Sequence, residues 1–126
     1  MKKQFCSKEP TLIQTHKGWL LPSQLLKTVE RVKTTLNPKL TIQGVVLTMF
    51  DRRNSLSEQV AQDVRSVLGD KVYQTVIPRN VRVSEAPSYG QPVLLYDHSC
   101  VGSQAYIHLA SEVIRRERDL RELKAA

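Results

Sequence analysis

The feature that most constrains this chain is a pair of short strand-like segments on either side of one amphipathic segment. The first contains the continuous apolar run Val45-Val46-Leu47, and the second, over residues 72–77, is rich in β-branched residues. Continuous apolar runs are typical of strands that are buried on both faces of a sheet. The segment between them repeats apolar residues at helical spacing, at Val60, Val64, Val67 and Leu68. The order strand, helix, strand predicts an α/β fold with a parallel sheet.

Local signals predict the bounds of this unit. The first strand is expected over 40–50, and the following helix is expected to open with the capping box Ser55-Leu56-Ser57-Glu58. Gly69 is expected to be the C′ residue that ends that helix, and Pro78 is expected to stop the second strand. Residues 79–92 contain two more prolines and show no period, which predicts a long loop of the kind that often carries function.

Further elements flank the unit. A helix is expected from Pro22-Ser23 to Asn37-Pro38, with an apolar stripe at Leu25, Leu26, Val29 and Val32. A short strand is expected over 93–96. A last helix is expected from Ser103. Its apolar face is expected to consist of Tyr106, Leu109, Ala110, Val113 and Ile114. Near its end, Glu112–Arg116 and Glu117–Arg121 have the four-residue spacing of helical ion pairs. With so few strands, the sequence predicts a partial three-layer α/β unit over 23–126, preceded by an arm over 1–22.

Several function classes find no support in these residues. The length of 126 residues predicts one domain, no run is apolar enough to span a bilayer, and no secretory signal is read. Cys6 and Cys100 are too isolated for a disulfide framework or a zinc site, so no metal site is expected. The histidines (His16, His98 and His108) are scattered and are expected at the surface or its boundary. No glycine precedes Lys-Ser or Lys-Thr, so a P-loop is absent and no catalytic residue is assigned.

Positive charge is concentrated in the first part of the chain. The net charge is +7, and residues 1–53 hold ten basic and three acidic residues, whereas the rest hold nine of each. Arg52 and Arg53 follow the first predicted strand, and Arg79 and Arg82 follow the second. If the strands are parallel neighbours, these arginines share one edge and form a phosphate-binding surface for a nucleotide or for the DNA backbone. The alternative is a solvated charged rim.

The first strand ends in an acidic residue, Asp51. It is superficially similar to a Walker-B element that holds Mg²⁺, but without a P-loop the metal has no phosphate to bridge. Ligands still bind at the carboxyl ends of parallel strands. Met49 and Phe50 therefore either flank a flat base or are two core side chains.

Two segments carry a family resemblance. The first is Thr48-Met49-Phe50-Asp51 followed by Arg53, and the second runs from 76 to 92 as VIPRNVRVSEAPSYGQP. Both resemble the C-terminal half of ParA/Soj-type chromosome-partitioning ATPases, which are MinD/ParA-type deviant Walker ATPases. The similarity extends over 23–117 through SQLLKTV at 23–29, Tyr96-Asp97, Gly102 and Ala105-Tyr106.

The resemblance implies the C-terminal half of a P-loop NTPase fold. Family members form ATP-bound dimers that bind DNA non-specifically, and a ParB-type partner stimulates hydrolysis. Their signature lysine and Mg²⁺-binding aspartates lie in an N-terminal half that these residues do not resemble. We therefore expect a truncated partitioning protein, without ATPase activity alone and without a cofactor of its own, although the family uses ATP and Mg²⁺. The alternative is a stand-alone basic module that binds DNA or modulates a full-length relative.

The resemblance also implies site residues. A nucleotide-base pocket is implied at Met49, Phe50, Asp51, Pro78 and Arg79, and DNA contacts are implied at Arg53 and Arg82. A loop near the nucleotide and the dimer interface is implied at Glu85, Ala86, Pro87, Ser88, Tyr89 and Gly90. The expected partners are non-specific DNA, a ParB-type protein and a second copy, because a missing sheet half would expose apolar surface. No membrane is expected, and the expected location is the bacterial cytoplasm, on the nucleoid.

Overall fold

The computed structural model describes the backbone of residues 20–126 and the side chains of residues 26–126. Its elements are α1 (Leu20–Thr35), β1 (Val45–Phe50), α2 (Ser55–Leu68), the 3₁₀ turn η1 (Gly69–Lys71), β2 (Val72–Pro78), α3 (Val81–Glu85), the 3₁₀ turn η2 (Ala86–Tyr89), α4 (Val93–Tyr96) and α5 (Val101–Ala125). The predicted arm lies outside the described residues, except that residues 20–22 begin α1. Within the described residues, no helix has the length and apolar character needed to cross a membrane.

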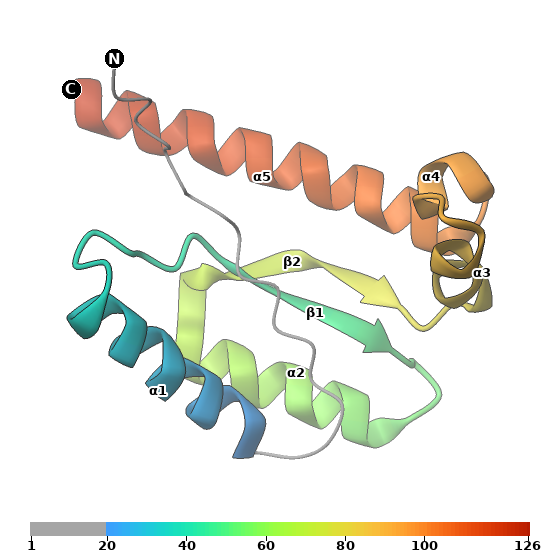
Figure 1. Ribbon diagram of the computed structural model, residues 1–126, viewed down its shortest axis with the longest axis horizontal. Coiled ribbons are helices and arrows are strands. Elements are labelled where there is room, and N and C mark those ends of the chain that lie inside the picture. The colour runs from blue at the N-terminus through green and yellow to red at the C-terminus, as the bar shows by residue number, and fades with distance from the viewer. Residues whose placement is uncertain (1–19) are drawn as a thin grey trace.

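The sheet lies between two helical layers (Figure 1). β1 and β2 pair in parallel, with α1 and α2 on one side and α5 on the other. The short helices α3 and α4 lie at the end to which both strands point. The predicted α/β class with parallel strands is confirmed.

Both faces of the sheet are buried. On the α2 side the core consists of Val45, Leu47, Ala61, Val64 and Val72. On the α5 side it consists of Val46, Tyr73, Ile77, Ala105 and Leu109. Burial on both faces is the physical reason for the continuous apolar run Val45-Val46-Leu47 in β1.

β1 is shorter than predicted, because it starts at Val45 and not at residue 40. Val45 pairs with Val72, which is the first residue of β2. In the described part of the chain, residues 40–44 therefore have no strand beside them to pair with. Gly44 lies against the ring of Tyr73, which occupies the space that a Cβ would need.

The predicted capping box is wrong, whereas the predicted end of the same helix is confirmed. The N-cap of α2 is Asn54, whose extended backbone (φ −105°, ψ 110°) precedes the helix and whose side chain accepts the N–H of Leu56. Ser55 is already helical, so its hydroxyl does not cap. Gly69 follows the helix with a φ of 53°, and its N–H donates to the carbonyl of Arg65.

The predicted loop over 79–92 and the predicted strand over 93–96 are also wrong. These residues form α3, η2 and α4. Helices of four or five residues are too short to show a period, and a four-residue apolar run does not distinguish a helix from a strand. Asn80 starts α3 by accepting the N–H groups of Arg82 and Val83 with its side chain.

α5 starts at Val101, two residues before the predicted start. The sulfur of Cys100 accepts the N–H of Ser103 at 3.3 Å. Two residues of the predicted apolar face, Ala110 and Ile114, are exposed. The buried face instead includes Ser103 and Glu112, which are polar.

Candidate functional site

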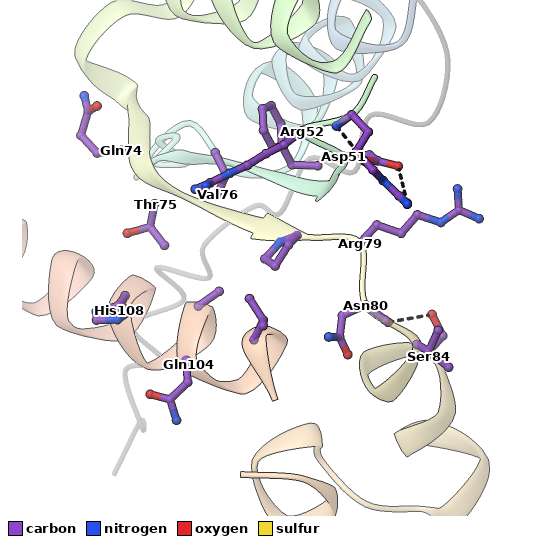
Figure 2. A pocket seen from close by; sticks show the side chains of 16 residues that line it. Asp51, Arg52, Gln74, Thr75, Val76, Arg79, Asn80, Ser84, Gln104 and His108 are labelled. Carbon is purple, nitrogen blue, oxygen red and sulfur yellow. Dashed lines mark hydrogen bonds and ion pairs between the residues drawn. The ribbon is translucent and has the colours of Figure 1, made fainter. Parts of the chain in front are cut away.

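A cleft of about 990 Å³ lies beside β2 and the ends of the two strands (Figure 2). One wall comes from the residues that end β1 and β2. The opposite wall comes from α5, through Val101, Gln104, Ala105 and His108, and α3 contributes Val81 and Ser84. This is the edge of a parallel sheet at which ligands bind in α/β proteins.

The ends of the two strands are joined at the cleft. Phe50 pairs with Pro78 in the sheet, and the N–H of Arg79 donates to the carbonyl of Phe50 at 3.0 Å. Phe50, Asp51, Pro78 and Arg79 therefore line the cleft together. Met49, the fifth residue of the predicted base pocket, is not among the lining residues and has a left-handed φ of 56°.

Arginines dominate the charge of the cleft. Arg52, Arg53 and Arg79 line it, and Asp51 is the single acidic residue that lines it in the described part of the chain. The side chains of Arg52 and Arg79 extend in opposite directions from the strand ends (Figure 2). Positive charge is thus spread along the edge, which suits an extended anion better than a single small one.

Asp51 and Arg53 form an ion pair within the loop after β1. Asp51 Oδ1 accepts the backbone N–H of Arg53 at 3.0 Å and its Nε–H at 3.2 Å, and Oδ2 lies 3.4 Å from Nη2. The hydrogen bond from the Arg53 side chain lowers the pKa of Asp51, and the Asp51 carboxylate raises the pKa of Arg53. The side chain of Arg53 is 91% exposed and that of Asp51 is 24% exposed, so the arginine side of the pair faces solvent.

Arg82 does not line the cleft. It lies on α3, where its Nη1 is 3.2 Å from Glu85 Oε2 and its Nε is 3.5 Å from Asp97 Oδ2. The structure therefore separates the two predicted DNA contacts, since Arg53 is at the cleft and Arg82 is in the group of short helices beyond it.

The predicted loop from Glu85 to Gly90 lies in the same group of short helices and does not line the cleft. Ala86 is buried, whereas Pro87, Ser88, Tyr89 and Gly90 are exposed. The ring of Tyr89 stacks on that of Tyr96 with centroids 5.0 Å apart. Gly90 ends η2 in the left-handed region with a φ of 66°.

Sequence reasoning missed the uncharged polar residues of the cleft. These are Gln74, Thr75, Asn80, Ser84 and Gln104, and His108 lies beside them. The four-residue spacing of Gln104 and His108 places both on one face of α5, but no sequence signal shows that this face meets β2. His108 is an exposed surface residue, as expected, and it also lines the cleft.

The cleft does not fit a Mg²⁺–phosphate site. Both oxygens of Asp51 face Arg53, and within the described residues no group of three His, Cys, Asp or Glu side chains could hold a metal ion. Glycine-rich backbone cradles nucleotide phosphates in P-loop proteins, and no glycine stands among the described residues that line the cleft. The donor set fits phosphate groups held by arginines alone.

Comparisons with known proteins identify the family. The CobQ/CobB/MinD/ParA nucleotide binding domain matches residues 22–93. The chromosome partitioning protein ParA of Caulobacter vibrioides is 73% identical over 104 residues, which are 82% of this chain and 39% of that protein. The sporulation initiation inhibitor protein Soj of Bacillus subtilis is 55% identical over 91 residues, 72% of this chain and 36% of that protein. The chromosome-partitioning ATPase Soj of Thermus thermophilus is 46% identical over 92 residues, which are 73% of this chain and 37% of that protein.

The chain thus spans less than two fifths of these relatives, at most 39% of the ParA protein. The similarity covers both strands, α2 and the residues of the cleft that lie at the ends of the strands. The chain belongs to the CobQ/CobB/MinD/ParA nucleotide binding domain family, and within it to the proteins that resemble ParA and Soj.

Proposed function

We propose that this chain is a ParA/Soj-type partitioning protein whose arginine edge binds DNA without sequence preference. The observation that carries the proposal is the gathering of Arg52, Arg53 and Arg79 at the ends of β1 and β2, where Asp51 supplies the single lining carboxylate among the described residues. Guanidinium groups bind phosphate oxygens strongly, and phosphate contacts carry no sequence information. The names of the Caulobacter and Thermus relatives, which refer to chromosome partitioning, agree with a DNA-bound role.

We propose further that these 126 residues do not hydrolyse ATP by themselves. Their sequence contains no P-loop, and the carboxylate at the cleft is paired with Arg53. By resemblance to the family, the chain would act in the cytoplasm, on the nucleoid, with a ParB-type protein and a second copy as partners.

A DNA-binding measurement tests the proposal. Fluorescence anisotropy with a short duplex of mixed sequence is followed from about 50 mM to about 200 mM salt, where the log of the affinity is expected to fall linearly with log salt. The triple variant R52A/R53A/R79A is expected to bind at least about tenfold more weakly, with a shallower slope because fewer counterions are released.

The control variant removes the same charge from another exposed surface. R115A/R118A/R121A takes three exposed arginines from α5, on residues that do not line the cleft. If it weakens binding as much as R52A/R53A/R79A does, only net charge matters and the edge is not the site.

A second candidate function is nucleotide binding without hydrolysis, as a stand-alone module or as a modulator of a full-length relative. The observation in its favour is the apolar surface of Val76, Pro78 and Ala105 beside the polar Thr75 and Gln104, a combination that suits a flat base. Titration with a fluorescent ATP analogue and Mg²⁺ tests it. Saturable binding that P78A and Q104A weaken would support this function. The absence of binding up to about millimolar nucleotide would exclude it.

A further inference from the structure

Arg82 lies between carboxylates from two different segments. Glu85, at the end of α3, pairs with its Nη1 at 3.2 Å, and Asp97, after α4, pairs with its Nε at 3.5 Å. Arg52 and Arg79, in contrast, make no ion pair with any described residue. The arginines that follow the two strands therefore differ in how much of their charge is available to another molecule.

The two carboxylates are themselves held in place. Glu85 Oε2 also accepts the hydroxyl of Tyr96 at 3.1 Å, and the Tyr96 ring stacks on Tyr89. Asp97 Oδ1 accepts the backbone N–H groups of Ser99 and Cys100, each at 3.1 Å. Because these bonds already restrict both side chains, pairing with Arg82 costs less side-chain entropy than pairing two free surface residues would.

The arrangement changes what a phosphate group would meet at Arg82. The side chain is 54% exposed, so solvent and a ligand can reach it. However, one guanidinium with two carboxylates carries a net charge of about −1, and a phosphate is repelled by like charge at this range. Arg82 can contact a phosphate favourably only when at least one carboxylate has moved away.

We propose that Glu85 and Asp97 form a carboxylate clamp that withholds Arg82 from DNA and so limits the affinity of the chain for DNA. The inference rests on the proposed function, because Arg82, in the short helices beyond the arginine edge, would add a phosphate contact to those that the edge makes. The clamp makes the binding strength depend on the group of short helices from α3 to α4, and not only on the loops after the strands.

The test neutralises the clamp without removing its structural hydrogen bonds. In E85Q/D97N, the amide oxygens still accept the Tyr96 hydroxyl and the N–H groups of Ser99 and Cys100. The double variant is expected to bind the same fluorescent duplex roughly fivefold more tightly, with a salt slope steeper by about 0.9, because one more phosphate is contacted. Adding R82A is expected to abolish this gain, whereas R82A in the original chain is expected to change affinity less than twofold.

A matched control separates the clamp from net charge. E58Q/D63N removes one Glu and one Asp charge on α2, where neither residue makes an ion pair with a described residue. Equal gains in the two double variants, or a gain that survives R82A, would overturn the clamp. If circular dichroism shows that E85Q/D97N is unfolded, D97N alone must still bind more tightly than D63N alone.

The failure of the clamp and the failure of the proposed function give different results. Salt-dependent binding by the original chain, with no gain in E85Q/D97N, overturns the clamp and leaves the proposed function standing. If the original chain and E85Q/D97N both fail to bind DNA at low salt, the proposed function and the clamp are both overturned.

Discussion

The two layers that cover the sheet stabilise it by different means. On the α2 side, Val45, Leu47 and Val72 pack against Ala61 and Val64, and further partly buried apolar residues extend this cluster. A side-chain hydrogen bond from α2 to β2 is long and exposed, from Arg65 Nη2 to the carbonyl of Gln74 at 3.5 Å. The α5 side combines apolar packing with a buried carboxylate, because Glu112 is only 6% exposed. Apolar packing depends on volume and shape, whereas a buried carboxylate depends on the particular donors that surround it.

Glu112 has such donors in β2 and α5. Its two oxygens accept the N–H groups of Gln74 at 2.8 Å and Thr75 at 2.9 Å, and Arg116 Nη2 donates to Oε1 at 2.9 Å. Arg116 also donates to the carbonyls of Asp70 and Val72. The register of the two strands shifts between the pair Val45–Val72 and the pair Leu47–Val76. The two N–H groups that donate to Glu112 lie in this part of β2. The difference between the layers teaches that α5 fixes the irregular part of β2 through polar contacts.

Removing the carboxylate is the most direct way to break this comparison. E112A leaves the N–H groups of Gln74 and Thr75 and the guanidinium of Arg116 without their partner, and is expected to cost about 3–5 kcal/mol of unfolding free energy. Urea denaturation followed by circular dichroism measures it. A loss below about 1 kcal/mol would show that water replaces the carboxylate, and that the α5 layer depends on apolar packing as the α2 layer does.

A cavity on the α2 side is expected to have a somewhat smaller effect. Leu47 is 2% exposed, and L47A is expected to cost about 3 kcal/mol through lost burial and the cavity left behind. L47M keeps the volume and is expected to cost less than about 1.5 kcal/mol. E112Q also nearly keeps the volume of its residue, but its amide turns an NH₂ group toward an N–H donor. Equal tolerance of L47M and E112Q in the same urea assay would contradict the proposed difference between the layers.

The pH dependence of stability sharpens the comparison further. Burial raises the pKa of Glu112, but the N–H groups of Gln74 and Thr75 and the charge of Arg116 outweigh it and hold the pKa below the ordinary 4.5. A carboxyl group whose pKa is lower in the native state than in the unfolded state stabilises the fold at pH values above its unfolded pKa. This contribution is lost as the pH falls through the native pKa. Below about pH 4.5, the original chain is therefore expected to lose stability faster than E112Q. The urea midpoints of the two proteins are measured between about pH 6 and about pH 3. Midpoints that fall by the same amount in both proteins would contradict this prediction.

The α2 layer could be predicted from the sequence, and the α5 layer only in part. The continuous apolar run Val45-Val46-Leu47, the β-branched residues of 72–77 and the α2 stripe are local signals of burial. The stripe is only partly right, because its Val67 is 70% exposed and the buried Ala61 is not part of it. The i,i+4 spacing of Glu112 and Arg116 was visible and their ion pair is present at 2.9 Å. Their contacts with β2 were not visible, because a hydrogen bond between residues 38 positions apart leaves no local pattern.

The candidate site divides in the same way. Arg52, Arg53 and Arg79 could be placed at one edge because parallel strands end together. The α5 residues Gln104 and His108 could not, because they depend on how a helix crosses a strand that is distant in sequence. The partners of Arg82 were missed because residues 79–92 were expected as a loop and 93–96 as a strand, and only α3 and α4 bring Glu85 and Asp97 to it.

The smallest expected effect concerns the start of α2, close to the arginine edge. The side chain of Asn54 accepts the N–H of Leu56 at 3.0 Å, so N54A leaves a helix donor without its cap and is expected to cost about 1 kcal/mol. S55A is expected to be neutral within about 0.5 kcal/mol, because Ser55 is exposed and already helical. Urea denaturation of both variants distinguishes the two possible caps. A larger loss in S55A than in N54A would restore the capping box read from the sequence, and would move the start of α2 one residue further from Arg52 and Arg53.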